Sequence, residues 1–106
     1  MKQHANSKDN QADHHLYEII DSEEDDVFKY GICGKPLNKN GDSPRANEQV
    51  RYLNRAVRRI RYFVTILFVG ILGRAKALEM EDEMIEAYRQ KNGCRPYGNP
   101  ENNTEL

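Results

Sequence analysis

The spacing of apolar and polar residues predicts a β-hairpin and a helix in the first half of the chain. Apolar residues alternate over residues 16–20 and recur over residues 27–33, with six mostly acidic residues between the two segments; this pattern is typical of two antiparallel strands. Ser43 and Pro44 then favour a helix start, because serine caps free N–H groups and proline needs no N–H at the first position. Apolar residues at spacings of three and four follow, which predicts a helix with one buried side.

The second half of the chain predicts a strand followed by a long helix. Residues 60–69 are β-branched and aromatic, so we expect a third strand that is mostly buried. The apolar run over residues 62–72 is shorter than the roughly 20 residues of a membrane span, and we expect no membrane contact. Residues 77–88 contain no Gly or Pro and predict a helix that Gly93 ends. The order β-β-α-β-α predicts an α+β fold with helices packed on a small mixed β-sheet.

One carboxylate of the second predicted helix falls on the wrong side of the helical pattern. At roughly 100° per residue, the other acidic residues of this helix share a polar face, whereas Glu81 lies between Leu78 and Ile85 on the apolar face. An unpaired buried carboxylate is costly, so a cation or hydrogen-bond donors should lie beside it. A structural ion pair with an arginine and a functional site both fit this pattern.

Composition divides the chain into one domain and two polar ends. The folded domain is expected over residues 15–100, between an N-terminal arm (residues 1–14) and a tail (residues 101–106) that have too few apolar residues to form a core. The N-terminus has no basic start followed by an apolar run, so no signal peptide is expected.

Charge is strongly segregated although the net charge is −1. Residues 1–26 sum to −6, residues 27–76 to +9 and residues 77–106 to −4. A basic central block between acidic flanks indicates a site for a polyanion such as nucleic acid.

Five short segments follow one another in an informative order. They are Tyr17 in the first strand, residues 28–34, residues 43–49, residues 73–85 and residues 95–99. With these motifs the chain resembles the GIY-YIG endonuclease superfamily, and more closely its URI-fold branch of bacterial polymorphic toxins. The family places its glutamate four residues before the isoleucine of a Leu/Met-Ile pair, which selects Glu81 over Glu79. The chain departs from the family in two places: the first tripeptide keeps only its tyrosine, and a lysine replaces the tyrosine of the second.

The resemblance implies a metal-dependent endonuclease that hydrolyses phosphodiester bonds. Glu81 would bind the metal, Mg²⁺ or Mn²⁺, since one carboxylate suits an ion that keeps several waters. Arg45 would stabilise the transition state, and Tyr17 would orient or deprotonate the attacking water. Lys29 would contact phosphate or lower the pKa of that tyrosine, and Asn99 would hydrogen-bond near the metal-bound water or the substrate. Further basic residues are assigned to nucleic-acid binding: Lys35, Arg51, Arg55, Arg59 and Arg74.

The expected partners follow from the same resemblance. Nucleic acid is the expected substrate, with DNA favoured over RNA, and an immunity protein is implied as a partner. We expect a monomer that acts in the bacterial cytoplasm, delivered as a domain of a secreted toxin. The alternative is a non-catalytic nucleic-acid-binding or interaction domain of the same fold. The catalytic hypothesis requires Tyr17, Arg45 and Glu81 to converge on one concave, basic surface.

Overall fold

The fold is a three-stranded sheet between two helices. The computed structural model describes residues 12–101, and the predicted arm up to residue 11 and the tail from residue 102 lie outside the described part. The elements in chain order are β1 (Asp13–Asp21), β2 (Asp26–Cys33), α1 (Pro44–Val57), β3 (Tyr62–Leu72) and α2 (Arg74–Asn92). The predicted α+β class and its order β-β-α-β-α are therefore confirmed.

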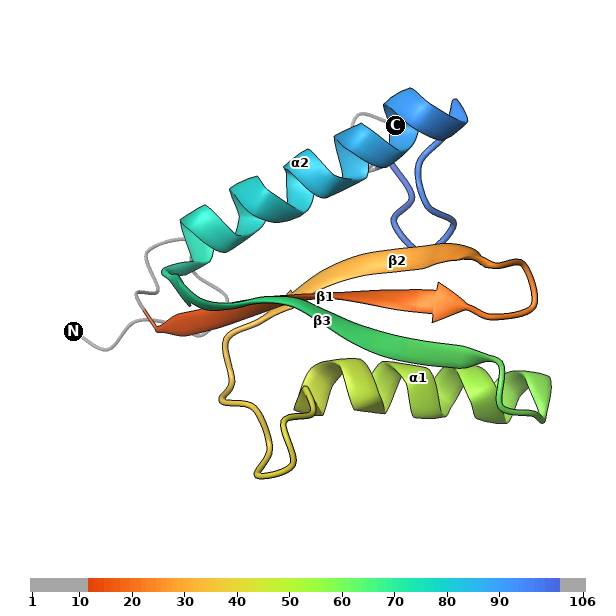
Figure 1. The fold of residues 1–106 in the computed structure, drawn as a ribbon, viewed down its shortest axis with the longest axis horizontal. Coiled ribbons are helices and arrows are strands. Elements are labelled where there is room, and N and C mark those ends of the chain that lie inside the picture. The colour runs from red at the N-terminus through yellow and green to blue at the C-terminus, as the bar shows by residue number, and fades with distance from the viewer. Residues whose placement is uncertain (1–11, 102–106) are drawn as a thin grey trace.

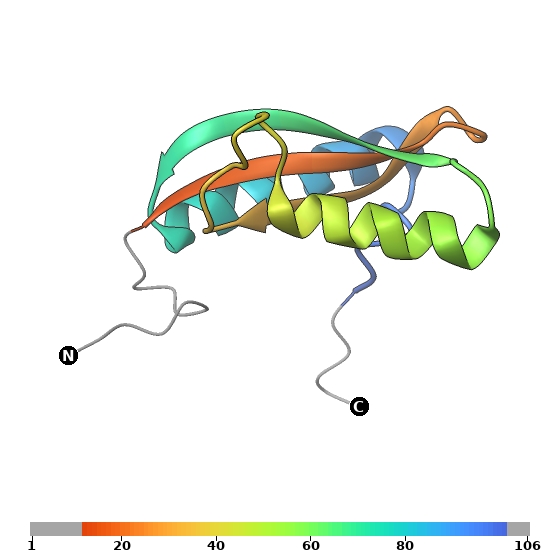
Figure 2. The same cartoon turned by 90° about the horizontal axis from the view of Figure 1, so that it is seen from below.

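The sheet has the strand order β2-β1-β3, so β1 is the central strand. It pairs antiparallel with both neighbours, and the sheet is therefore antiparallel throughout, not mixed as predicted. The two helices cover opposite faces: α1 lies on one side of the sheet and α2 on the other (Figure 1; Figure 2). Successive residues of a strand point to opposite faces, and Tyr17 and Ile19 accordingly belong to the core under α1, whereas Leu16 belongs to the core under α2.

The third strand is an edge strand, which corrects the prediction that it is mostly buried. It runs from Tyr62 to Leu72, and side chains such as Phe68 and Val69 are half or more exposed. Each helix covers only part of β3: Val64 and Ile66 pack in the core under α1, and Leu67 packs in the core under α2. β-branched composition therefore indicated a strand correctly, but it did not indicate the position of that strand in the sheet.

The first strand begins at Asp13, inside the predicted arm (residues 1–14) and three residues before the predicted start of the strand at residue 16. His14 and His15 are buried, because Asp13 and His14 pair with the last residues of the long strand β3 and His15 pairs with Cys33 of β2. Two adjacent histidines at the end of a polar segment do not by themselves indicate burial, so this position was not predictable.

The start of α1 is fixed as the sequence predicts. Ser43 is the N-cap, its Oγ accepts a hydrogen bond from the Ala46 N–H at 3.2 Å, and Pro44 occupies the first turn. The same Oγ lies 2.6 Å from Nε2 of the buried His15. This contact joins the helix start to the central strand, and it thereby fixes where the first turn of α1 projects its side chains. Within the described residues, no helix is long and apolar enough to cross a membrane.

Candidate active site

The predicted catalytic residues lie around one cavity at the β2 edge of the sheet. The cavity has a volume of about 340 Å³ and receives side chains from both helices, from β1 and β2, and from the segment that follows α2. Because β2 is an edge strand, residues from opposite faces of the sheet can meet beside it. The predicted residues among those that line the cavity are Tyr17, Lys29, Arg45, Arg74, Glu81 and Asn99.

Tyr17 reaches the cavity across a glycine. It pairs with Gly31 of β2, and a Cβ at that position would collide with the Tyr17 ring, so only glycine permits this packing. The Tyr17 hydroxyl donates a hydrogen bond to Oε1 of Gln49 on α1 at 2.8 Å. Burial raises the pKa of Tyr17 to about 12, although the nearby Arg45 acts in the opposite direction. Tyr17 is therefore a neutral phenol near pH 7, and Lys29 is not among the groups that shift its pKa.

Glu81 is a half-buried carboxylate that faces the cavity. Within residues 12–101, no ion pair or hydrogen bond engages its side chain, which removes the alternative of a closed pair with an arginine. Burial raises the pKa of Glu81, and the adjacent Asp82 raises it further, while Lys29, Arg74 and Arg95 lower it. Glu81 thus faces positive charges without closing on any of them.

The cavity is basic overall. Four cationic residues line it, namely Lys29, Arg45, Arg74 and Arg95, against the two carboxylates of Glu81 and Asp82. The pKa of Lys29 is lowered, mainly by burial and also by Arg45, whereas Glu81 raises it. Positive charge concentrated in a partly enclosed cavity attracts anions such as phosphate.

The segment after α2 closes one side of the cavity by binding the free edge of β2. The Gly98 N–H donates to the Phe28 carbonyl at 2.8 Å, and a Cβ on Gly98 would press against Phe28 and Lys29. The Asn99 side chain accepts from the Tyr30 N–H at 2.8 Å and donates to the Tyr30 carbonyl at 2.9 Å. Asn99 therefore lines the cavity but uses both ends of its amide on β2. This pairing favours a positioning function over the predicted contact with water or substrate.

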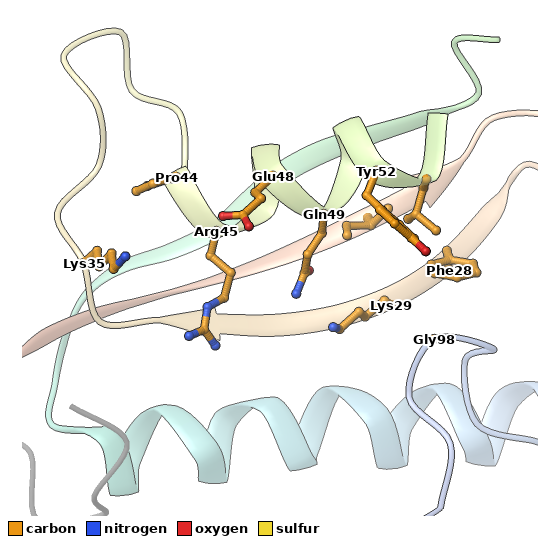
Figure 3. A pocket seen from close by; sticks show the side chains of 11 residues that line it. Phe28, Lys29, Lys35, Pro44, Arg45, Glu48, Gln49, Tyr52 and Gly98 are labelled. Atoms are coloured by element: carbon orange, nitrogen blue, oxygen red, sulfur yellow. The ribbon is translucent and has the colours of Figure 1, made fainter. Parts of the chain in front are cut away.

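A second cavity of about 630 Å³ adjoins the first. Lys29, Arg45, Gln49 and Gly98 line both cavities. Lys35, predicted to bind nucleic acid, lines this second cavity (Figure 3).

The structure does not bring the remaining predicted basic residues to either cavity. Arg51 and Arg55 are exposed on α1 and line neither one. Arg59 lies beyond the end of α1 and forms two hydrogen bonds with the Glu23 carboxylate of the β1–β2 turn, one of them 2.6 Å from Nη2 to Oε1. Its guanidinium is therefore already paired, as expected for a residue that stabilises the turn.

Sequence reasoning assigned no function to three polar residues that line the first cavity: Gln49, Arg95 and Asp82, the last of which the helical pattern placed on the polar face. Gln49 stands four residues after Arg45 in α1, so the two share one side of the helix, and this spacing could have identified it. Arg95 opens the last of the five motifs, but it was given no function; its Nε donates to the Asn99 carbonyl at 2.7 Å while its side chain lines the cavity. The position of Gln49 could be predicted from helical spacing, whereas the return of residues 93–100 to the β2 edge could not be predicted from the sequence.

The donors beside Glu81 fit a hard divalent cation bound through few protein ligands. No group of three or more His, Cys, Asp and Glu residues that could hold a metal occurs within the described part of the chain. The cavity lining instead offers carboxylate, hydroxyl and amide oxygens, and it includes no His or Cys. This set does not suit Zn²⁺, but it suits Mg²⁺, which keeps most of its waters and takes one or two carboxylates.

The fold and the cavity together define the class of this domain. The small antiparallel sheet between two helices agrees with the fold that the sequence resemblance implies. The family model described as URI fold toxin 2 matches residues 7–93, and the chain therefore belongs to the URI fold toxin 2 family. Comparison with curated proteins and with solved structures gave no significant match.

Proposed function

We propose that this domain is a metal-dependent endonuclease that hydrolyses phosphodiester bonds of DNA. The observation that carries this proposal is that Glu81, a carboxylate with no ion pair or hydrogen bond within residues 12–101, converges with four cationic side chains and a tyrosine around one cavity. A carboxylate close to a bound phosphate repels it, so this position disfavours a site that only binds phosphate. A hydrolase has a use for the carboxylate, because it must hold a metal ion as well as a phosphate.

The cations of the cavity bind and stabilise the phosphate. Arg45 projects from the first turn of α1, and its planar guanidinium offers paired donors to two phosphate oxygens. Such donors act most strongly when negative charge builds up on the phosphate as water attacks and the ester oxygen leaves. Lys29, half-buried on β2, adds a point charge from the other side of the cavity, and Arg74 adds one from the start of α2.

The tyrosine orients the attacking water. The Tyr17 hydroxyl donates its proton to Gln49, so the lone pairs of its oxygen remain available to accept a hydrogen bond from water. With a pKa of about 12, Tyr17 is a poor base at neutral pH. We therefore assign it to positioning of the water and not to its deprotonation.

Glu81 is the residue that would hold Mg²⁺ or Mn²⁺, with Asp82 as the second carboxylate that lines the cavity. When bound, the ion would supply charge neutralisation at the phosphate and a water of lowered pKa.

Membership in a toxin family supports the biological setting of this chemistry. We propose that the domain is delivered to a target cell, that it acts on nucleic acid in the bacterial cytoplasm, and that an immunity protein neutralises it in the producing cell.

A nicking assay tests the proposed function. The purified chain is incubated with supercoiled plasmid DNA and, in parallel, with a structured RNA, in the presence of Mg²⁺, Mn²⁺ or EDTA. We expect nicked and linear DNA with either metal and intact DNA with EDTA. Binding of DNA without cleavage under all three conditions would contradict the enzyme and favour the non-catalytic binding domain.

A further inference from the structure

The second cavity adjoins the proposed active site and has a different character. It shares Lys29, Arg45, Gln49 and Gly98 with the first cavity. Its other walls are mostly apolar and come from β1, β2 and α1, namely Ile19, Phe28, Pro44, Tyr52 and Leu53; Lys35 and the carboxylate of Glu48 are the remaining charged groups of the lining. A molecule that extends from one cavity into the other would therefore meet cations first and an apolar surface next.

Two aromatic residues face each other across this cavity. Tyr52 on α1 points toward Phe28 on β2 (Figure 3). The Phe28 ring is held in place by Tyr62, whose ring centroid lies 5.1 Å away, and by Tyr97 at 5.9 Å. Tyr52 is instead 74 % exposed, so its ring is free to cover a planar group in the cavity. An exposed tyrosine opposite a fixed phenylalanine is a suitable pair of surfaces for stacking.

A cationic region followed by an apolar aromatic region matches the phosphate and the base of one nucleotide. The phosphate would lie among the cations shared with the first cavity, and the attached base would lie between Tyr52 and Phe28. Bases stack on aromatic side chains because every base has a π-face, and loss of one such contact typically weakens binding by roughly five- to a hundred-fold. At the mouth of the second cavity, Lys35 can bind the next phosphate of the same strand.

We propose that the second cavity is a subsite for an unpaired nucleobase next to the cleaved phosphate. The domain therefore acts on single-stranded or locally unpaired DNA. This inference rests on the proposed function, because the cleaved phosphate is placed at the first cavity. A base in a duplex exposes only its edges in the grooves, and it must leave the stack to enter a pocket; a strand that is already unpaired has no such cost.

Binding measurements without metal separate the subsite from catalysis. A short fluorescein-labelled DNA, single-stranded or annealed to its complement, is titrated with the chain in EDTA and followed by anisotropy. We expect the wild type to bind the single strand roughly ten-fold more tightly than the duplex. Tyr52→Ala should weaken single-strand binding by roughly five- to a hundred-fold, while duplex binding changes little. Tyr52→Phe, which keeps the ring, should retain wild-type binding.

Phe63→Ala is the matched control, since Phe63 is also an exposed aromatic residue but lies on β3 and lines neither cavity. It should bind both DNA forms as the wild type does. Equal losses for the single strand and the duplex in Tyr52→Ala, or no loss for either, would overturn the subsite. A loss in Phe63→Ala as large as in Tyr52→Ala would also overturn it, because affinity would then follow exposed aromatic area in general.

An abasic scan locates the base. Single strands that lack one base at successive positions are compared with the intact strand. Removal of the base at one position should weaken binding to the wild type but not to Tyr52→Ala, because this variant has already lost the stacking contact with that base. If these binding contrasts are observed but the nicking assay shows no cleavage, the proposed function is contradicted and the subsite is supported. If the chain cleaves DNA in a metal-dependent way but the binding contrasts are not observed, the subsite is contradicted and the nuclease function is supported.

Discussion

The two edges of the sheet are built in opposite ways. At the β2 edge, residues 93–100 bind the free backbone groups of the strand through Gly98 and the Asn99 amide, and cationic side chains surround the cavity beside it. At the β3 edge, apolar side chains such as Phe68, Val69 and Leu72 are exposed, and none of them lines either of the two cavities.

The difference shows how so small a domain builds a site. A three-stranded sheet has one central strand, and here β1 supplies the apolar core and a single functional side chain, Tyr17. The two helices lie on opposite faces of the sheet and can present residues to a common point only around an edge. The β2 edge becomes that point because Gly31 lets Tyr17 approach and the segment after α2 closes the side. Within residues 12–101, no comparable glycine contact or returning segment is found at the β3 edge.

The largest expected effect in this comparison comes from Glu81. Glu81→Gln should lower the rate of metal-dependent cleavage by roughly 10³-fold, because a neutral amide binds Mg²⁺ poorly and the ion supplies much of the charge stabilisation. Glu79→Gln is the control. Glu79 is exposed on the solvent face of the same helix, where its Oε1 lies 3.7 Å from Nζ of Lys76. Plasmid cleavage measures both variants, and equal losses would remove the assignment of Glu81.

The same substitution should raise stability at neutral pH. Burial raises the pKa of Glu81 above 4.5 in the folded state, so the folded state binds the proton more tightly than the unfolded state does. The protonated carboxyl therefore favours folding below pH 4.5, and this contribution is lost as the pH rises through the folded-state pKa. Glu81→Gln should unfold at higher urea than the wild type at pH 7, and the difference should shrink below pH 4.5.

A smaller effect is expected from Arg45, compared with an arginine outside the cavity. Arg45→Lys should lower the cleavage rate by roughly 10²-fold with little change in DNA affinity, because an ammonium keeps the charge but loses the paired donors that act in the transition state. Arg59→Lys should leave the rate unchanged, since Arg59 is paired with Glu23 at the β1–β2 turn. Single-turnover rates and binding constants separate the two effects. If both variants lose rate equally, Arg45 is only one basic residue among many.

The smallest expected effect comes from Asn99 at the β2 edge, compared with a residue at the β3 edge. Asn99→Ala removes both hydrogen bonds to Tyr30 and should lower the free energy of unfolding by about 1–2 kcal/mol. The cleavage rate should fall by roughly ten-fold, because the segment that carries Arg95 loosens. At the other edge, Val69→Lys changes a residue that is 61 % exposed; its stability should stay within about 0.5 kcal/mol of the wild type, and its rate should be unchanged. A loss of rate in Val69→Lys similar to that in Asn99→Ala would show that the β3 edge also belongs to the site.

Some parts of the site were predictable because they depend on local patterns. The helix start at Ser43 and Pro44 was predicted from capping chemistry, and the position of Arg45 in the first turn follows from it. Glu81 was identified because a carboxylate on the apolar side of a helix breaks a regular pattern. Arg59 was assigned to nucleic acid from charge alone, and charge does not reveal that Glu23, thirty-six residues away along the chain, is its partner. The start of β1 was missed because the burial of His14 depends on the length of β3.

The sequence alone determined the elements, their order, the basic centre of the chain and the unusual position of Glu81, because helix and strand periodicities and caps act over a few neighbouring residues. The tertiary structure decided which strand is central, which edge carries the cavities and which arginines reach them. It also decided that Asn99 clamps β2 and that Tyr17 remains a neutral phenol. These properties depend on contacts between residues far apart in the chain and on burial, which sets both the cost of a charge and the pKa of the group that bears it.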